Sequence, residues 1–517
     1  MFCCGKGEAF TVRRDSYWEP HGPRHSSVCN EFTNRQFMGW AVWLLAVVPL
    51  AVVQVLSIGP YITYLARLNS EEDQTSLFGS ILIPYDSYWS YLTTVSILLM
   101  ALSTLVGGPL ADVTPRRKDI LIFTTLLGGC VLPLIIIFLP STGKFWHFVP
   151  LVYLPSTALT NLAGVIWHSY LIDMVPESQR AMRLAQSFLM AAVGFVVFGG
   201  VAVFIEGLHD PCSGDADVCV DGELPEGAAN PQMEAIVTYT MPIACAWGMA
   251  CLLFVHHALP PLAASRKPSR PSLIGEAFNN LRVTAKKLGK FPQTSWYLAN
   301  EAVVACGDTT IATLFSVIAL DKLGLASADV AQVMSVSIVF VVTSNMIAGV
   351  LMKRELLTPI KLIIIGRSGT VLNSLYFAFY VRDLKTFWIS GIFFGCFNGL
   401  LGVTSTQLFS SLVPPVYKSE FFALRSVNAK LLAWIGPLLF AVVTTAGSFE
   451  LAVASLGLYT VAGTVLLLRV DVARGMDAAL NFEEEEEEEE EGGVGVGAGG
   501  VELTKQITTK EHTMVLV

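Results

Sequence analysis

Two carboxylates stand out in the sequence because they lie within an otherwise apolar stretch, at Glu301 and Asp308. They are seven residues apart, which is close to two helical turns, so both side chains would share one face of a helix. An ionisable group inside a membrane costs at least ~2–3 kcal/mol and commonly faces the interior, where it serves transport. We therefore expect Asp308 above all, together with Glu301, to carry a proton or bind a substrate. The alternative is that Asp308 only forms a hydrogen bond to a neighbouring helix.

Uncharged polar side chains occur in other apolar stretches. Asn161 and His168 are also seven residues apart, and Gln54 begins a polar stripe that continues to Tyr64. We predict that Gln54, Asn161 and Asn398 line the same substrate site. The alternative for each is a hydrogen bond that holds two helices together, and we expect His168 to be structural.

Membrane helices must position these side chains, because the chain is too apolar for a soluble protein. Of its 517 residues 53% are hydrophobic and 15% are charged, and the mean hydropathy is +0.57. Soluble domains carry about 25% charged residues. We predict an all-α protein embedded in a lipid bilayer, which takes about 20 apolar residues to cross. The expected spans are 38–65, 88–111, 120–139, 147–171, 184–205, 237–257, 294–320, 328–351, 360–381, 385–408, 421–446 and 449–468.

The loop charges predict how these spans are oriented. Basic residues follow the second, fourth, eighth, tenth and twelfth spans and fill the interval 258–293 between the two sets of six. The opposite loops are poor in Lys and Arg, and 206–234 has none. Since loops rich in Lys and Arg stay in the cytosol, both termini should be cytosolic. We expect a cytosolic segment at 1–37, six-helix halves at 38–257 and 294–470, a basic linker at 258–293, and a tail at 471–517.

The tail and the cysteines complete the prediction. Nine consecutive glutamates, 483–491, equal the formal charge of −9, so nothing indicates a nucleic-acid partner. The acidic, Gly-rich tail should be disordered and dispensable for transport. Cys212 and Cys219 lie in a loop that should face an oxidising compartment, and they form a disulfide or remain free thiols. The chain has no motif for a metal, a cofactor or catalysis, so we do not expect an enzyme.

The loop after the second span resembles a family signature. Gly108–Lys118 is similar to the G-x-L-A-D-R-x-G-R-R sequence of the major facilitator superfamily, with Val113 in place of an Arg and Pro115 in place of a Gly. This resemblance implies two six-helix halves that rock about a central site.

The same signature indicates a gate. Asp112, Arg116 and Arg117 match its charged positions, and we expect Asp112 to pair with Arg425, with Glu420 nearby. Three basic residues lie near the expected cytosolic ends of later spans, where long side chains can extend to the interface, although gating pairs are the alternative: Arg367, Arg425 and Lys430.

The second half carries a narrower resemblance. Leu412–Pro415 and Lys418–Leu424 look like the I-P-P-x-x-x-x-E-F-F-G-L stretch of the autophagy-linked vacuole effluxer family, with Ala423 in place of a Gly. Gly307–Ile311 is similar to that family's D-G-x-x-T-I, and Trp434–Leu438 extends the match.

That resemblance implies a secondary transporter that releases amino acids from a vacuole or lysosome-like compartment into the cytosol. Proton coupling stays open. The first alternative is a transporter of another solute, such as a sugar, an organic anion or a drug, at the plasma membrane. The second is a receptor or scaffold with a transporter fold.

Overall fold

The computed structural model describes residues 34–493 apart from 54–56, 71–73, 80, 114–115, 140–142, 175–176, 209–233, 262–272, 322, 326, 415–417 and 447–448. The first half contains α1 (Asn34–Val53), α2 (Gly59–Leu68), α3 (Tyr85–Val113), α4 (Arg117–Thr125), α5 (Leu132–Ile137), α6 (Phe148–Met174), α7 (Glu177–Leu208) and α9 (Met241–Ala258), with short helical turns at Leu126–Val131, Gly143–His147 and Ile236–Thr240. The second half contains α11 (Pro292–Asp321), α12 (Ser327–Lys353), α13 (Pro359–Tyr380), α14 (Leu384–Ser411), α15 (Lys418–Ala433), α16 (Ile435–Thr445) and α17 (Phe449–Leu467).

The spans agree with the expected ones. Ten helical segments of the described chain are long and apolar enough to cross a membrane, and each overlaps an expected span. Of the two remaining expected spans, the first corresponds to α1 and α2, and the seventh to the 30-residue α11. The predicted all-α membrane fold of about twelve helices is confirmed.

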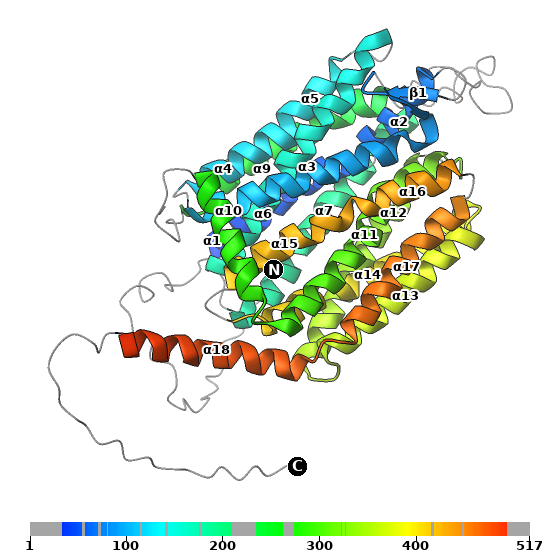
Figure 1. The fold of residues 1–517 in the computed structure, drawn as a ribbon. Coiled ribbons are helices and arrows are strands. Elements are labelled where there is room, and N and C mark those ends of the chain that lie inside the picture. The colour runs from blue at the N-terminus through cyan, green and yellow to red at the C-terminus, as the bar shows by residue number, and fades with distance from the viewer. Residues whose placement is uncertain are drawn as a thin grey trace, which may run out of the picture.

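The helices form two groups that follow the order of the chain (Figure 1). Helices α1 to α9 make one group and α11 to α17 the other. The groups meet where α7 packs on α12 and where α3 packs on α15 and α16. A short antiparallel hairpin, β1 (Gln74–Leu77) and β2 (Ile81–Pro84), pairs Thr75 with Ile83 at the end of the bundle opposite α10 and α18 (Figure 1).

Glycine spacing explains one close helix pair. Gly391, Gly395 and Gly399 of α14 recur every four residues, so they form one stripe along the helix. A Cβ atom added at Gly395 would lie 2.4 Å from the carbonyl oxygen of Ser337 in α12. Small residues allow two membrane helices to approach through their backbones, and α12 and α14 pack closely in this way.

Two further helices lie outside the expected spans. The linker contains α10 (Leu273–Leu288), which packs on α3 and α15. The expectation of a disordered tail is wrong for its first part, because α18 (Val472–Gly493) follows the last span. Phe482 of α18 is 9% exposed and packs edge-to-face on Phe291, with the Lys290 ammonium 5.0 Å from its ring centre. Apolar residues ahead of the glutamate run therefore reach the bundle.

Candidate functional site

Helix α11 positions the expected carboxylates. It packs against α15 and α17 along its length, and Gly436 brings the start of α16 close to it, since a Cβ atom there would lie 2.0 Å from the carbonyl oxygen of Cys306. Tyr297 and Glu301 are one turn apart, so their side chains meet on one face. The Tyr297 hydroxyl donates to Glu301 Oε1 over 2.8 Å.

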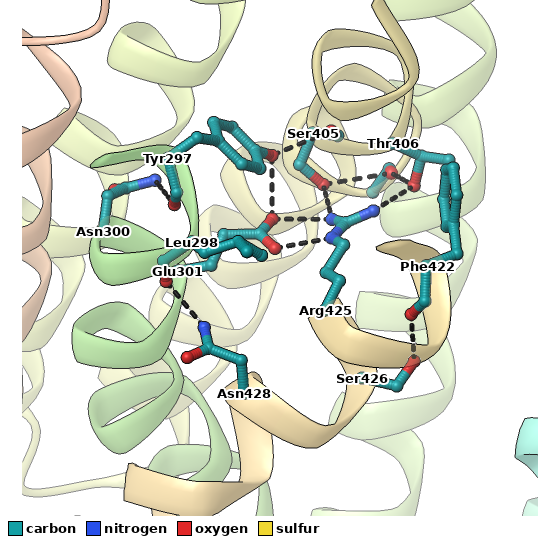
Figure 2. A network of polar contacts seen from close by, with 11 residues as sticks. Tyr297, Leu298, Asn300, Glu301, Ser405, Thr406, Phe422, Arg425, Ser426 and Asn428 are labelled. Carbon is teal, nitrogen blue, oxygen red and sulfur yellow. Dashed lines mark hydrogen bonds and ion pairs between the residues drawn. The ribbon is translucent and has the colours of Figure 1, made fainter. Parts of the chain in front are cut away.

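Glu301 forms a buried ion pair with Arg425 of α15, which Figure 2 shows. Arg425 Nε donates to Glu301 Oε2 over 2.5 Å and Nη2 donates to Oε1 over 2.6 Å. The two parallel bonds match the planar guanidinium to the planar carboxylate. The Arg425 side chain is 16% exposed and that of Glu301 is 12% exposed. Glu301 therefore faces the interior, but another residue of this chain already engages it.

Neighbouring polar groups complete this network (Figure 2). Arg425 Nη2 donates to Ser405 Oγ over 3.2 Å and Nη1 to Thr406 Oγ1 over 3.5 Å, both on α14. The Tyr297 hydroxyl lies 2.8 Å from the Ser405 carbonyl oxygen. Arg425 also stacks over Phe409, 5.1 Å from the ring centre. The network ties α11, α14 and α15 together within the second half.

In the described chain Arg425 pairs with Glu301, so both members of this ion pair belong to the second half. The expected pairing of Asp112 with Arg425 stays a prediction. Asp112 lies near the end of α3 and Glu420 lies in the first turn of α15, but their side chains fall outside the described residues.

Asp308 differs from Glu301 in its surroundings. Within the described part of the chain its carboxylate makes no hydrogen bond and no ion pair, and its side chain is half-buried in α11. It interacts electrostatically with Arg367 of α13. Arg367 was expected near the membrane surface, with its side chain reaching out to it. The residue is instead only 4% exposed. Arg367 Nη1 donates to Asn300 Oδ1, while its buried Nε has no partner among the described residues.

Asn161 joins the two halves. Its amide nitrogen donates to Thr104 Oγ1 over 2.8 Å and to the Met100 carbonyl over 3.1 Å, both on α3. Its amide oxygen accepts from the Lys430 ammonium of α15. Asn161 therefore fits the helix-joining alternative, and it also holds the charged group of Lys430 at the interface between the halves.

The remaining expected site residues are dispersed. Asn398 lies half-buried on α14 without a hydrogen bond in the described chain. Arg116 is exposed at the start of α4, and Arg117 beside it is 1% exposed. Gln54 lies outside the described residues, as do both cysteines of the expected disulfide, Cys212 and Cys219.

The sequence analysis placed two basic residues too close to the edge of the membrane. Arg367 and Lys430 both lie within apolar stretches, and that position was the available signal. Each was assigned to the edge of the membrane because several residues of uncertainty in the end of a span can move a residue from the edge to the interior. In the described chain no group of three or more His, Cys, Asp or Glu side chains is placed to hold a metal ion.

Comparison with known proteins fits this architecture. In Bacillus subtilis (strain 168) a relative described as an uncharacterized MFS-type transporter, YxiO, is 23% identical over 398 residues, which cover 76% of this chain and 86% of the relative. A D-xylose-proton symporter superposes with a TM-score of 0.60 at 14% identity, covering 85% of this chain and 98% of its own. The nucleoside transporter NupG superposes with a TM-score of 0.56 at 12% identity, covering 84% and 100%.

A family model described as "Vacuole effluxer Atg22 like" matches residues 33–202 and 225–480. The match takes in both helical halves and every described member of the polar network. These relatives and structural neighbours are transporters and none is an enzyme. The chain therefore belongs to the vacuole effluxer Atg22-like family and is a secondary transporter of the major facilitator type.

Proposed function

We propose that this transporter moves amino acids out of a vacuole or lysosome-like compartment into the cytosol. The observation that carries the proposal is the match to the vacuole effluxer family over 33–202 and 225–480. The loop charges support an orientation with both termini in the cytosol, in which the bundle end that carries α10 and α18 is cytosolic. The link to autophagic recycling follows from the same family resemblance.

Alternating access supplies the mechanism. The two helical groups meet along α3 and α7 on one side and α12, α15 and α16 on the other, so a rocking motion would expose a site between them to each face in turn. The Asp308 carboxylate has no hydrogen-bond partner within the described chain, which supports a role for it in binding. It takes a proton from the acidic lumen or binds the ammonium group of the substrate.

Loaded organelles test substrate and compartment together. Vacuoles isolated from cells with and without this chain are loaded with a labelled amino-acid mixture, and efflux is followed over time. We expect faster efflux of one or more amino acids when the chain is present. Equal efflux in both preparations, with the chain detected in the vacuolar membrane, would contradict the proposal.

Purified protein in proteoliposomes separates the alternatives. Two structural neighbours are named for a nucleoside and for D-xylose, so the substrate panel includes both, together with an organic anion. Flux of one of these without flux of any amino acid would favour the alternative of another solute. No substrate-dependent flux at all would favour a receptor or scaffold.

A further inference from the structure

Lys430 is a cation without a carboxylate partner in the described chain. It lies near the end of α15 and is half-buried, and its ammonium donates to the amide oxygen of Asn161 across the interface between the halves. An amide oxygen is a dipole and leaves the charge of the ammonium uncompensated. A partly desolvated cation of this kind is costly unless an anion pairs with it.

The surrounding charges do not compensate Lys430. The carboxylate of the polar network, Glu301, accepts hydrogen bonds from Arg425 with both of its oxygens. Since Arg425 is paired with Glu301, Lys430 is the charge in this part of the described interface that an anion from outside the chain can compensate.

Lys430 lies roughly one helical turn from Asp308 along the bundle axis. Cys306 Sγ of α11 donates to the Leu432 carbonyl of α15 over 3.1 Å, so these two positions are level. Lys430 comes two residues before Leu432, and Asp308 comes two residues after Cys306. At 1.5 Å per residue the two charged positions are about 6 Å apart along the bundle axis, roughly one helical turn.

We propose that Lys430, held by Asn161, is the subsite for the carboxylate of the substrate. The proposal rests on the proposed function and deepens it by assigning a residue to one end of the amino acid. A carboxylate that binds Lys430 replaces Asn161 as its partner. Asn161 belongs to the first half and Lys430 to the second, so this exchange weakens a hydrogen bond between the halves. Substrate binding should therefore favour the rocking movement of one half against the other.

Transport by the full chain in proteoliposomes tests the subsite with labelled leucine as the probe. Leucinamide, which lacks the carboxylate but keeps the rest of the molecule, is the matched competitor. We expect leucine to compete well and leucinamide poorly in the wild type. In Lys430→Met the KM for leucine should rise about tenfold or more, because a charge-assisted hydrogen bond is lost, and the preference over leucinamide should disappear. Lys430→Arg should keep that preference.

Two variants of Asn161 distinguish binding from packing. Asn161→Asp places a carboxylate beside Lys430 that competes with the substrate, so KM should rise while the protein stays folded. Asn161→Leu removes the bond between the halves but leaves the cation, so leucine should remain preferred over leucinamide. The control is Lys353→Met, which removes an exposed lysine at the end of α12 and should match the wild type.

The outcomes separate this inference from the proposed function. If leucine is transported, and folded Lys430→Met keeps both its KM and the preference over leucinamide, the subsite is wrong. If no amino acid is transported, the proposed function fails, and thermal stabilisation by lactate, compared with propane-1,2-diol, tests the subsite alone. Lactate should then stabilise the wild type and not Lys430→Met. Equal effects on both proteins would overturn the inference.

Discussion

The two halves of the transporter stabilise their interiors in different ways. The second half buries an ion pair, Glu301 with Arg425, and a further cation at Arg367. The first half buries one described cation, Arg117 at the start of α4, and packs an aromatic pair in its interior. Trp40 and Trp167 stack with ring centres 4.4 Å apart, and each indole N–H donates to the backbone carbonyl of the other residue, over 3.1 and 2.9 Å.

This difference between the halves indicates a division of labour, in which one pair of residues serves transport and the other serves packing. Burying two charges costs as much as or more than their attraction returns, so an apolar pair would stabilise the bundle as well or better. The tryptophan pair needs no such compensation, because its only polar groups bond to each other's backbone. We infer that the ion pair of the second half is retained for transport, whereas the tryptophan pair of the first half serves packing.

Breaking the ion pair should have the largest effect. Arg425→Met leaves the Glu301 carboxylate buried without its cation, and Glu301→Gln leaves the guanidinium without its anion. Each single variant should lose about 3–5 kcal/mol of stability and all transport. Thermal unfolding of purified protein and leucine flux in proteoliposomes measure the two losses.

The double variant sharpens this result. Glu301→Gln with Arg425→Met removes both charges, so it should recover most of the stability while transport stays lost. If the double variant also transports normally, the pair is structural and the proposed division of labour fails. Arg469→Met, at an exposed arginine that lies 5.3 Å from the Trp296 ring centre, is the control for losing a cation in the same half.

Asp308→Asn should affect transport more than stability, because the carboxylate has no hydrogen-bond partner in the described chain to lose. If Asp308 carries a proton, the variant loses accumulation driven by a proton gradient but keeps substrate exchange without a gradient. If Asp308 binds the substrate ammonium, both are lost and KM rises. Near-normal kinetics and pH dependence in the variant would remove Asp308 from the mechanism.

In the first half, Trp167→Phe tests whether the tryptophan pair contributes packing alone. The ring stack remains, but the donor to the Trp40 carbonyl is lost, which should cost about 1–2 kcal/mol. We expect a lower unfolding temperature with leucine KM and maximal flux close to those of the wild type. Loss of transport by the folded variant would show that the tryptophan pair contributes more than packing.

The smallest effect is expected at the tail. Truncation after Phe482 removes the glutamate run and should change neither stability nor flux. Truncation after Gly475 also removes Phe482 and its contact with Phe291, which should cost about 1 kcal/mol and leave flux intact. Two truncations with the same unfolding temperature would show that α18 does not stabilise the second half.

Features that depend on neighbouring residues were predicted from the sequence better than features that depend on residues far apart in the chain. The spans were predicted within a few residues because hydropathy over about 20 residues is a local property. The tail was predicted less well, since the averaged charge of 471–517 concealed a short apolar segment that ends at Phe482. The position of Glu301 on an interior face followed from its spacing to Asp308, but its partner did not.

The sequence by itself determined that this chain is a bundle of membrane helices with carboxylates inside one of them, because apolar length and helical spacing depend only on nearby residues. The tertiary structure alone decided which polar groups meet. Glu301 and Arg425 are 124 residues apart, and Asn161 and Lys430 are 269 apart. Such pairs depend on the rotation and depth of helices packed against each other, and a shift of one residue turns a side chain by about 100°.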